Sequence, residues 1–284
     1  MHATSEPASK RMGMGRMILP LALGAAFIAL YIPVLVPLFR QWLNDPNYHH
    51  GLLVPVIAGF LLYKQRERLK ELREGNGAVA GIICVASAAV LLIGGTAASE
   101  LFTSRVSIPL LLIGASLFLR GVRFTKVAAF PLLFLFLMIP LPYIIYYKIT
   151  FPMQLMSAKI STRVLHILQV NVIRKGNILH LPNYSLEVVA ACSGLRSLMT
   201  MFVLALILAA LSGISTTRKV ILVALAVPAA IAANTIRLVV TAVGAYTSGP
   251  ALAEGILHEI SGLIVFFVGF MLLMIAALLL RLKR

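Results

Sequence analysis

The sequence predicts an all-α polytopic integral membrane protein, a bundle of about eight transmembrane helices. Of its 284 residues 60% are hydrophobic and only 12% are charged, and the mean hydropathy is +0.97. These values exclude an ordinary soluble domain. Backbone polar groups in lipid must be satisfied within the spanning structure, and the alternation typical of a barrel is absent, so helices are expected. Lys and Arg fall in short clusters between apolar runs, as at the ends of membrane helices.

Seven apolar runs have membrane length, and a shorter run at 51–63 is ambiguous. The long runs cover residues 17–39, 78–96, 101–119, 127–142, 189–212, 219–247 and 257–280. With eight spans and an inside amino terminus, the inside segments hold 16 Lys and Arg residues and the outside segments hold 7. Omitting 51–63 would put the densest basic cluster, 64–73, outside. We therefore expect eight spans with both termini cytoplasmic.

The chain is expected to form a single membrane-embedded domain over residues 1–284, with a cytoplasmic tail at 1–16. Its longest outer loop, 143–188, is extracytoplasmic in this topology. Within it, apolar residues of 151–170 recur near helical spacing with two cations between them, which predicts an amphipathic helix at the membrane interface. Residues 177–189 are predicted to return as a short extended segment with a turn at Pro182.

The formal net charge of +16 raises the question of nucleic-acid binding. The cations are dispersed between apolar runs, and no continuous basic groove with interleaved aromatic residues is present. No nucleic-acid partner is therefore predicted, and nothing in the sequence indicates a cofactor.

Three polar residues from consecutive runs fall at one depth. Cys192 lies about three residues inside the outer end of the sixth run, and His258 opens the eighth from the outside. Arg237 is about 18 residues from the inner end of the seventh run. At about 1.5 Å per residue in a layer of roughly 30 Å, it lies within about 5 Å of the outer boundary. The three are predicted to meet near the outer membrane face.

Each of these residues taken singly has an ordinary explanation. Cysteine is a common small apolar filler, an arginine near a helix end extends to the interface, and a histidine at a span end is often interfacial. Neighbours strengthen the functional interpretation: Asn234 shares a helix face with Arg237, and Arg196 follows Cys192 by one turn. Because polar groups in lipid face the bundle interior or a wet cavity, a pocket open to the outside is expected.

The short outer segment before the second run carries Tyr48 and His50. A metal site from Asp45, His49 and His50 is an alternative, but one short loop rarely supplies a closed ligand set. No metal is therefore predicted. Tyr48 and His50 are assigned to the lining of the pocket, as substrate contacts.

Cysteine, histidine and arginine form a workable set for acyl transfer. A Cys192 thiolate attacks a peptide carbonyl to form a thioester, and His258 activates the thiol and protonates the departing amine. Arg237 stays protonated, so its role is to stabilise an oxyanion or hold the thiolate or a substrate carboxylate. Arg196 is the spare cation, suited to an acidic side chain of the substrate.

The run Ala-Cys-Ser-Gly-Leu-Arg-Ser at 191–197, followed by Asn-Thr-Ile-Arg at 234–237 and then His258, resembles the signature of the exosortase/archaeosortase family. Two earlier segments, 45–55 and the proline-containing 130–142, also resemble that family. The resemblance runs from about 40 to 275. Archaeal members can carry arginine at the third position, so His258 fits the bacterial, exosortase-like pattern.

The resemblance implies an integral-membrane cysteine transpeptidase with Cys192, Arg237 and His258 as catalytic residues. Such enzymes process protein substrates bearing a C-terminal sorting signal of the PEP-CTERM kind: a short motif, a transmembrane helix and a basic tail. They cut at the outer face of the inner (plasma) membrane and pass the new carboxyl end to a membrane lipid or another acceptor. Two alternatives stay open: an intramembrane cysteine protease that uses water, and a non-enzymatic transporter or scaffold in exopolysaccharide export. The sequence does not indicate an oligomeric state.

Overall fold

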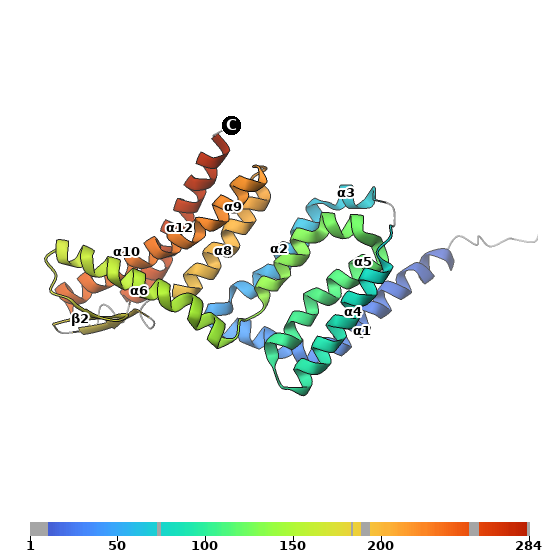
Figure 1. Cartoon of the computed structure of the whole chain (residues 1–284), viewed down its shortest axis with the longest axis horizontal. Helices are drawn as coiled ribbons and strands as arrows, with labels where there is room; N and C mark the ends of the chain where they lie inside the picture. The colour runs from blue at the N-terminus through green and yellow to red at the C-terminus, as the bar shows by residue number, and fades with distance from the viewer. Residues whose placement is uncertain (1–10, 73–74, 183, 189–193, 250–255, 283–284) are drawn as a thin grey trace, which may run out of the picture. The chain divides into compact units, whose positions relative to one another are not determined.

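The computed structural model describes residues 11–72, 75–182, 184–188, 194–249 and 256–282, without side chains at 11–23, 194–197, 256–261 and 265. The chain is almost entirely helical, with one small sheet (Figure 1). It divides into two compact units, of which the first holds residues 1–45 and 51–140 and the second holds 46–50 and 141–284. The all-α membrane fold is confirmed, whereas the single domain stays a prediction.

The first unit is a set of apolar helices. Its elements are α1 (Arg11–Asn44), α2 (His50–Lys64), α3 (Arg66–Lys70), α4 (Ala78–Ala97), α5 (Leu101–Phe134) and the 3₁₀ helix η2 (Leu135–Met138). The helices α4 and α5 pack along each other. Glu100 caps α5 by accepting hydrogen bonds from the backbone N–H groups of Phe102 and Thr103, which satisfies donors that the first turn of a helix leaves open.

The helix α5 consists of two limbs that meet at Gly121 (Figure 1). Gly121 has φ +83° and ψ 177°, a conformation essentially restricted to glycine. A Cβ atom there would also collide with the backbone of Gly75. Ser116 and Thr125, one on each limb, share a hydrogen bond of 2.9 Å. The predicted runs 101–119 and 127–142 correspond to these limbs, the second of which continues through η2 to Met138 before Pro140 and Pro142.

Buried hydrogen bonds join the helices of the first unit. Trp42 of α1 donates from Nε1 to the carbonyl of Met138, 2.8 Å away. Arg105 of α5 is buried and donates from Nη1 to Oε1 of Gln41 over 2.7 Å. A polar group in an apolar helix needs such partners because its desolvation is otherwise uncompensated.

The second unit contains the remaining helices and the sheet. Its elements are η1 (Pro46–Tyr48), α6 (Tyr143–Ile167), β1 (Ile173–Lys175), β2 (Ile178–Leu181), β3 (Tyr184–Glu187), α8 (Gly194–Leu211), α9 (Thr216–Ala224), α10 (Ala226–Ser248) and α12 (Ile256–Leu282). The three strands form an antiparallel meander in the order β1-β2-β3. Leu179 and Leu186 of the sheet pack with Leu165 of α6 and Leu238 of α10, so the sheet is fixed to both helices.

The observed helices correspond to the predicted apolar runs. In the part of the chain that the structure describes, five helical stretches are long and apolar enough to cross a membrane: 24–44, 78–97, 101–138, 216–248 and 262–282. The run at 51–63 lies in α2, and that at 189–212 is represented by α8. The count of eight spans and the cytoplasmic termini stay predictions.

The outer loop differs in detail from its prediction. A helix is present, but it begins at Tyr143 and extends to Ile167. The extended return is confirmed as the hairpin of β2 and β3, although Asn183 of its turn lies outside the described residues. Strand β1 was not predicted at all.

Candidate functional site

Three helices of the second unit pack against one another. Met201 of α8, Ala233 of α10 and Gly269 of α12 meet at one point, where a Cβ atom on Gly269 would lie 2.5 Å from Cε of Met201. Both Met201 and Ala233 are fully buried. Each of these helices carries or directly follows one of the three predicted catalytic residues, so the packing brings their helices together.

Arg237 lies on α10 and is only 6% exposed. Its guanidinium group is directed at α12: a Cβ atom on Gly262 would lie 3.6 Å from Nη2 and 3.8 Å from Cζ. His258 precedes Gly262 by four residues, which is about one turn or 6 Å of the same helix. A residue no larger than alanine at this position leaves room for the guanidinium beside α12.

The other predicted catalytic groups are placed only by their backbone or not at all. Cys192 lies outside the described residues, two positions before α8 begins at Gly194. Arg196 lies in the first turn of α8 and His258 in the first turn of α12, and the structure describes neither side chain. The backbone positions of α10 and α12 therefore place Arg237 and His258 near each other.

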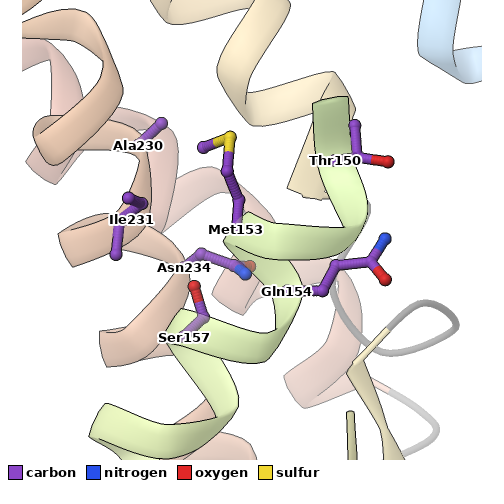
Figure 2. Close-up of a pocket in the computed structure, with 7 residues that line it drawn as sticks. All are labelled: Thr150, Met153, Gln154, Ser157, Ala230, Ile231 and Asn234. Carbon is purple, nitrogen blue, oxygen red and sulfur yellow. The ribbon is translucent and has the colours of Figure 1, made fainter. Parts of the chain in front are cut away.

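Asn234 is one turn before Arg237 on α10 and is 5% exposed. Its side chain points from α10 toward α6, where Ser157 lies on the facing turn (Figure 2). Together with Thr150, Met153, Gln154, Ala230 and Ile231, these residues line a recess between the two helices. Its empty space is about 240 Å³, counting the open space at the mouth.

The recess belongs to a longer buried contact, the polar seam. Its side chains are Thr150, Gln154, Ser157 and Ser161 of α6 and Asn234 of α10, all buried. Ser161 donates to the carbonyl of Thr235 across the seam. Meanwhile Tyr143, Ile144, Ile145 and Met156 are among the exposed residues of α6. The exposed side of α6 also carries Lys148, Lys159 and Arg163, so it mixes apolar side chains with cations, as a helix at a membrane interface does.

Sequence reasoning found the α10 side of the seam and missed the α6 side. The signal was present: positions 150, 154, 157 and 161 recur at intervals of four, three and four, which is one helical face. The apolar residues between them also have helical spacing, and they indicated an amphipathic helix at the membrane interface instead.

Several buried side-chain oxygens of α6 and α10 lack hydrogen bonds. Among the described residues, Oε1 of Gln154, Oγ1 of Thr235 and Oγ1 of Thr241 are buried without a partner. Native proteins leave few such groups, and each costs about 1–3 kcal/mol.

Tyr48 and His50 belong to the second unit, although His50 is the first residue of α2 and the rest of that helix belongs to the first unit. Their rings lie 6.3 Å apart, and the Tyr48 hydroxyl donates to the carbonyl of Leu141. The element η1, which contains Tyr48, packs against α8, the helix that follows the cysteine. Across the described ranges, no group of three or more His, Cys, Asp or Glu side chains is arranged to hold a metal ion.

The fold and the buried polar groups define a class: a multi-pass helical membrane protein with a polar cluster inside one bundle. The chain matches the family model of the transmembrane exosortases over residues 42–275. This match covers most of the 284 residues, including Cys192, Arg237 and His258. The protein belongs to the transmembrane exosortase family. No curated protein and no solved structure matches it.

Proposed function

We propose that this exosortase is a membrane cysteine transpeptidase that cleaves C-terminal sorting signals at the outer face of the inner membrane. The substrates are proteins whose carboxyl end carries a short motif, a transmembrane helix and a basic tail. The new carboxyl end passes through a thioester on Cys192 to a lipid or another acceptor.

In the proposed reaction, Sγ of Cys192 attacks the carbonyl carbon of the scissile bond, and His258 takes the thiol proton. The carbon–nitrogen bond then breaks, and His258 gives that proton to the leaving amine. Arg237 stays charged and stabilises the negative carbonyl oxygen of the tetrahedral intermediate. An acceptor hydroxyl or amine finally attacks the thioester, the carbon–sulfur bond breaks, and the acceptor proton returns the sulfur to a thiol.

The remaining site residues bind the substrate in this proposal. Arg196 takes an acidic side chain of the cleavage motif, because a guanidinium binds a carboxylate through two parallel hydrogen bonds. Asn234, Tyr48 and His50 contact the peptide around the scissile bond.

The placement of Arg237 is the observation that carries the proposal. A charge buried in a membrane bundle is costly and is usually retained for function. Here the guanidinium lies against Gly262, one turn from His258 and on a helix packed against the one that follows Cys192. An activated thiol needs a base and a cation near it, and this packing supports both.

The test uses thiol labelling and processing in parallel. In a Cys84→Ala background, which leaves Cys192 as the one thiol of the chain, iodoacetamide at neutral pH should modify Cys192 faster than it does after Arg237→Gln. Cys192→Ala should leave the protein folded and a signal-bearing substrate uncut. Normal processing by Cys192→Ala would refute the proposal. A slow-reacting Cys192 that is indifferent to Arg237 would instead favour a transporter or scaffold.

Mass spectrometry of the product separates transfer from hydrolysis. Transfer leaves the new carboxyl end joined to a lipid or another acceptor, whereas hydrolysis leaves a free acid. A free acid as the sole product, with membrane lipids present, would reduce the proposal to an intramembrane protease.

A further inference from the structure

One end of the first unit gathers cations from two segments that are far apart in the sequence. Residues 64–74, which run from the last residue of α2 past α3, contain five Lys and Arg and three Glu. Residues 120–126 of α5 contain three Lys and Arg and no carboxylate. Eight cations against three carboxylates give the two segments together a net charge of +5.

Packing brings the two segments together. Leu69 of α3 is buried in one apolar cluster with Ala128 of α5. Beyond α3, the carbonyl of Asn76 accepts a hydrogen bond from the N–H of Val122, next to the reversal of α5 at Gly121. Figure 1 shows α3 beside that reversal. The described cations of both segments form the basic patch, which consists of Lys64, Arg66, Arg68, Lys70, Arg120, Arg123 and Lys126.

Most of the basic patch is available to a ligand. In the part of the chain that the structure describes, Glu67 forms ion pairs with Arg66 and Lys70. Four further cations are exposed and form no ion pair with a described carboxylate: Lys64, Arg68, Arg123 and Lys126. Because like charges gather here without enough carboxylates to balance them, an anion near the patch is attracted.

Exposed apolar side chains next to the cations place the patch at the level of lipid headgroups. On α2 and α5, the large hydrophobic residues that precede Lys64 and Arg120 are exposed: Phe60, Tyr63, Phe118 and Leu119. In a membrane bundle, side chains of this kind contact lipid acyl chains, and cations at the end of such a surface extend into the headgroup layer. The Arg66 guanidinium lies over the Tyr63 ring, 4.0 Å from its centroid. The anions nearest to the patch are therefore lipid phosphates.

We propose that the basic patch binds the headgroups of anionic phospholipids in the adjacent leaflet. In the predicted topology this end of the unit faces the cytoplasm, whose leaflet carries a negative surface potential. Each Lys or Arg near such a surface strengthens binding by about fivefold. The reversal at Gly121 contributes to the site because it presents Arg120 and Arg123 beside α3. This binding is independent of the proposed reaction and uses no residue of the second unit.

The test measures phospholipid binding by the full-length protein in detergent, with native mass spectrometry. Phosphatidylglycerol and phosphatidylcholine with identical acyl chains are titrated separately, so that only the headgroup differs. The patch variant is Arg123→Gln with Lys126→Gln, at two exposed positions of α5. The matched control is Arg174→Gln with Lys175→Gln, at two exposed positions of β1 in the second unit. Thermal midpoints without added lipid should equal that of wild type for both.

Wild type should bind phosphatidylglycerol more tightly than phosphatidylcholine. The patch variant should lose affinity for phosphatidylglycerol alone, on the order of 20-fold for two cations, and the control should keep it. The exchange Arg123→Lys with Lys126→Arg retains both charges and should bind as wild type does. Raising ammonium acetate to about 1 M should reduce the headgroup preference, since charges are then screened beyond about 3 Å.

Equal affinities of wild type for the two lipids, or equal losses in the patch variant and the control, would overturn the inference. An acidic protein segment is the other ligand that the charge would attract, and soluble polyglutamate serves as its probe. Tighter binding of polyglutamate than of phosphatidylglycerol by wild type, lost in the patch variant, would assign the patch to a protein and overturn the inference as well.

Discussion

Replacement of Gly262 by valine should inactivate the protein without unfolding it. A Cβ atom at this position lies 3.6 Å from Nη2 and 3.9 Å from Nη1 of Arg237, which is ordinary van der Waals contact. A γ carbon extends about 1.5 Å beyond Cβ. If this carbon is directed at the guanidinium, it would lie about 2.1 Å from Nη2. The guanidinium therefore has to move by an ångström or more.

The magnitude follows from the sensitivity of catalysis to position. Misplacement of a catalytic group by about 1 Å can cost on the order of 10²-fold in rate. Gly262→Val should therefore lower kcat/KM for substrate cleavage by about 10²-fold. Gly262→Ala keeps the contact distance and should stay within a few-fold of wild type. It should also raise the thermal midpoint slightly, because alanine favours a helix over glycine by up to about 1 kcal/mol.

The assay is cleavage of a signal-bearing substrate by purified protein in detergent, with thermal midpoint and size-exclusion profile as measures of folding. Gly59→Val is the matched control, at an exposed helical glycine with no atom within 4 Å of the added Cβ. Wild-type activity of Gly262→Val in folded protein would refute the assignment of Arg237 to the site. A Gly262→Ala variant as inactive as Gly262→Val would show that a Cβ atom at position 262 does not fit beside the Arg237 guanidinium.

Three further predictions concern the first unit. Trp42→Phe removes the donor to the Met138 carbonyl and should lower the free energy of unfolding by about 1–3 kcal/mol, measured by denaturation in detergent; an unchanged stability would contradict a buried hydrogen bond there. Gly121→Ala forces a side chain into a conformation essentially restricted to glycine and against Gly75; it should cost at least about 1–3 kcal/mol, and a neutral effect would mean that α5 is not kinked as described. Hydrogen bonding from Thr103, with a smaller contribution from the Phe102 N–H, holds the pKa of Glu100 below its ordinary value of 4.5. Its capping contribution, about 1 kcal/mol, should be present above pH 4.5 and disappear as the pH falls through the lower pKa of the folded state; the stability difference between wild type and Glu100→Gln should narrow over that range, and a constant difference would exclude the charged cap.

The α10 side of the site could be predicted from the sequence because the spacing of polar residues along a single helix is enough to reveal it. Asn234, Arg237 and Thr241 interrupt an apolar run at helical spacing, and all three are buried on one face. The depth argument needed only the rise per residue and the thickness of the bilayer. No partner helix had to be known.

The other parts of the site and fold depend on which helices and strands pack against each other. The same spacing on α6 is compatible with a polar face turned outward to water or inward to α10, and only the packing decides between them. Strand β1 has three exposed residues and no alternation to mark it, so it becomes a strand through its pairing with β2. Tyr48 belongs with α8 through a tertiary contact that no local pattern encodes.

The sheet also constrains the chain that leads into α8. Val188 is fully buried in the packed cluster of the sheet, and its N–H donates to the carbonyl of Asn177. Gly194 begins α8 six positions later. Six residues span at most about 20 Å, so Val188 and the start of α8 limit how far apart the sheet and this helix can lie. Under the proposed function, glycines inserted after Val188 should lower turnover before they lower stability.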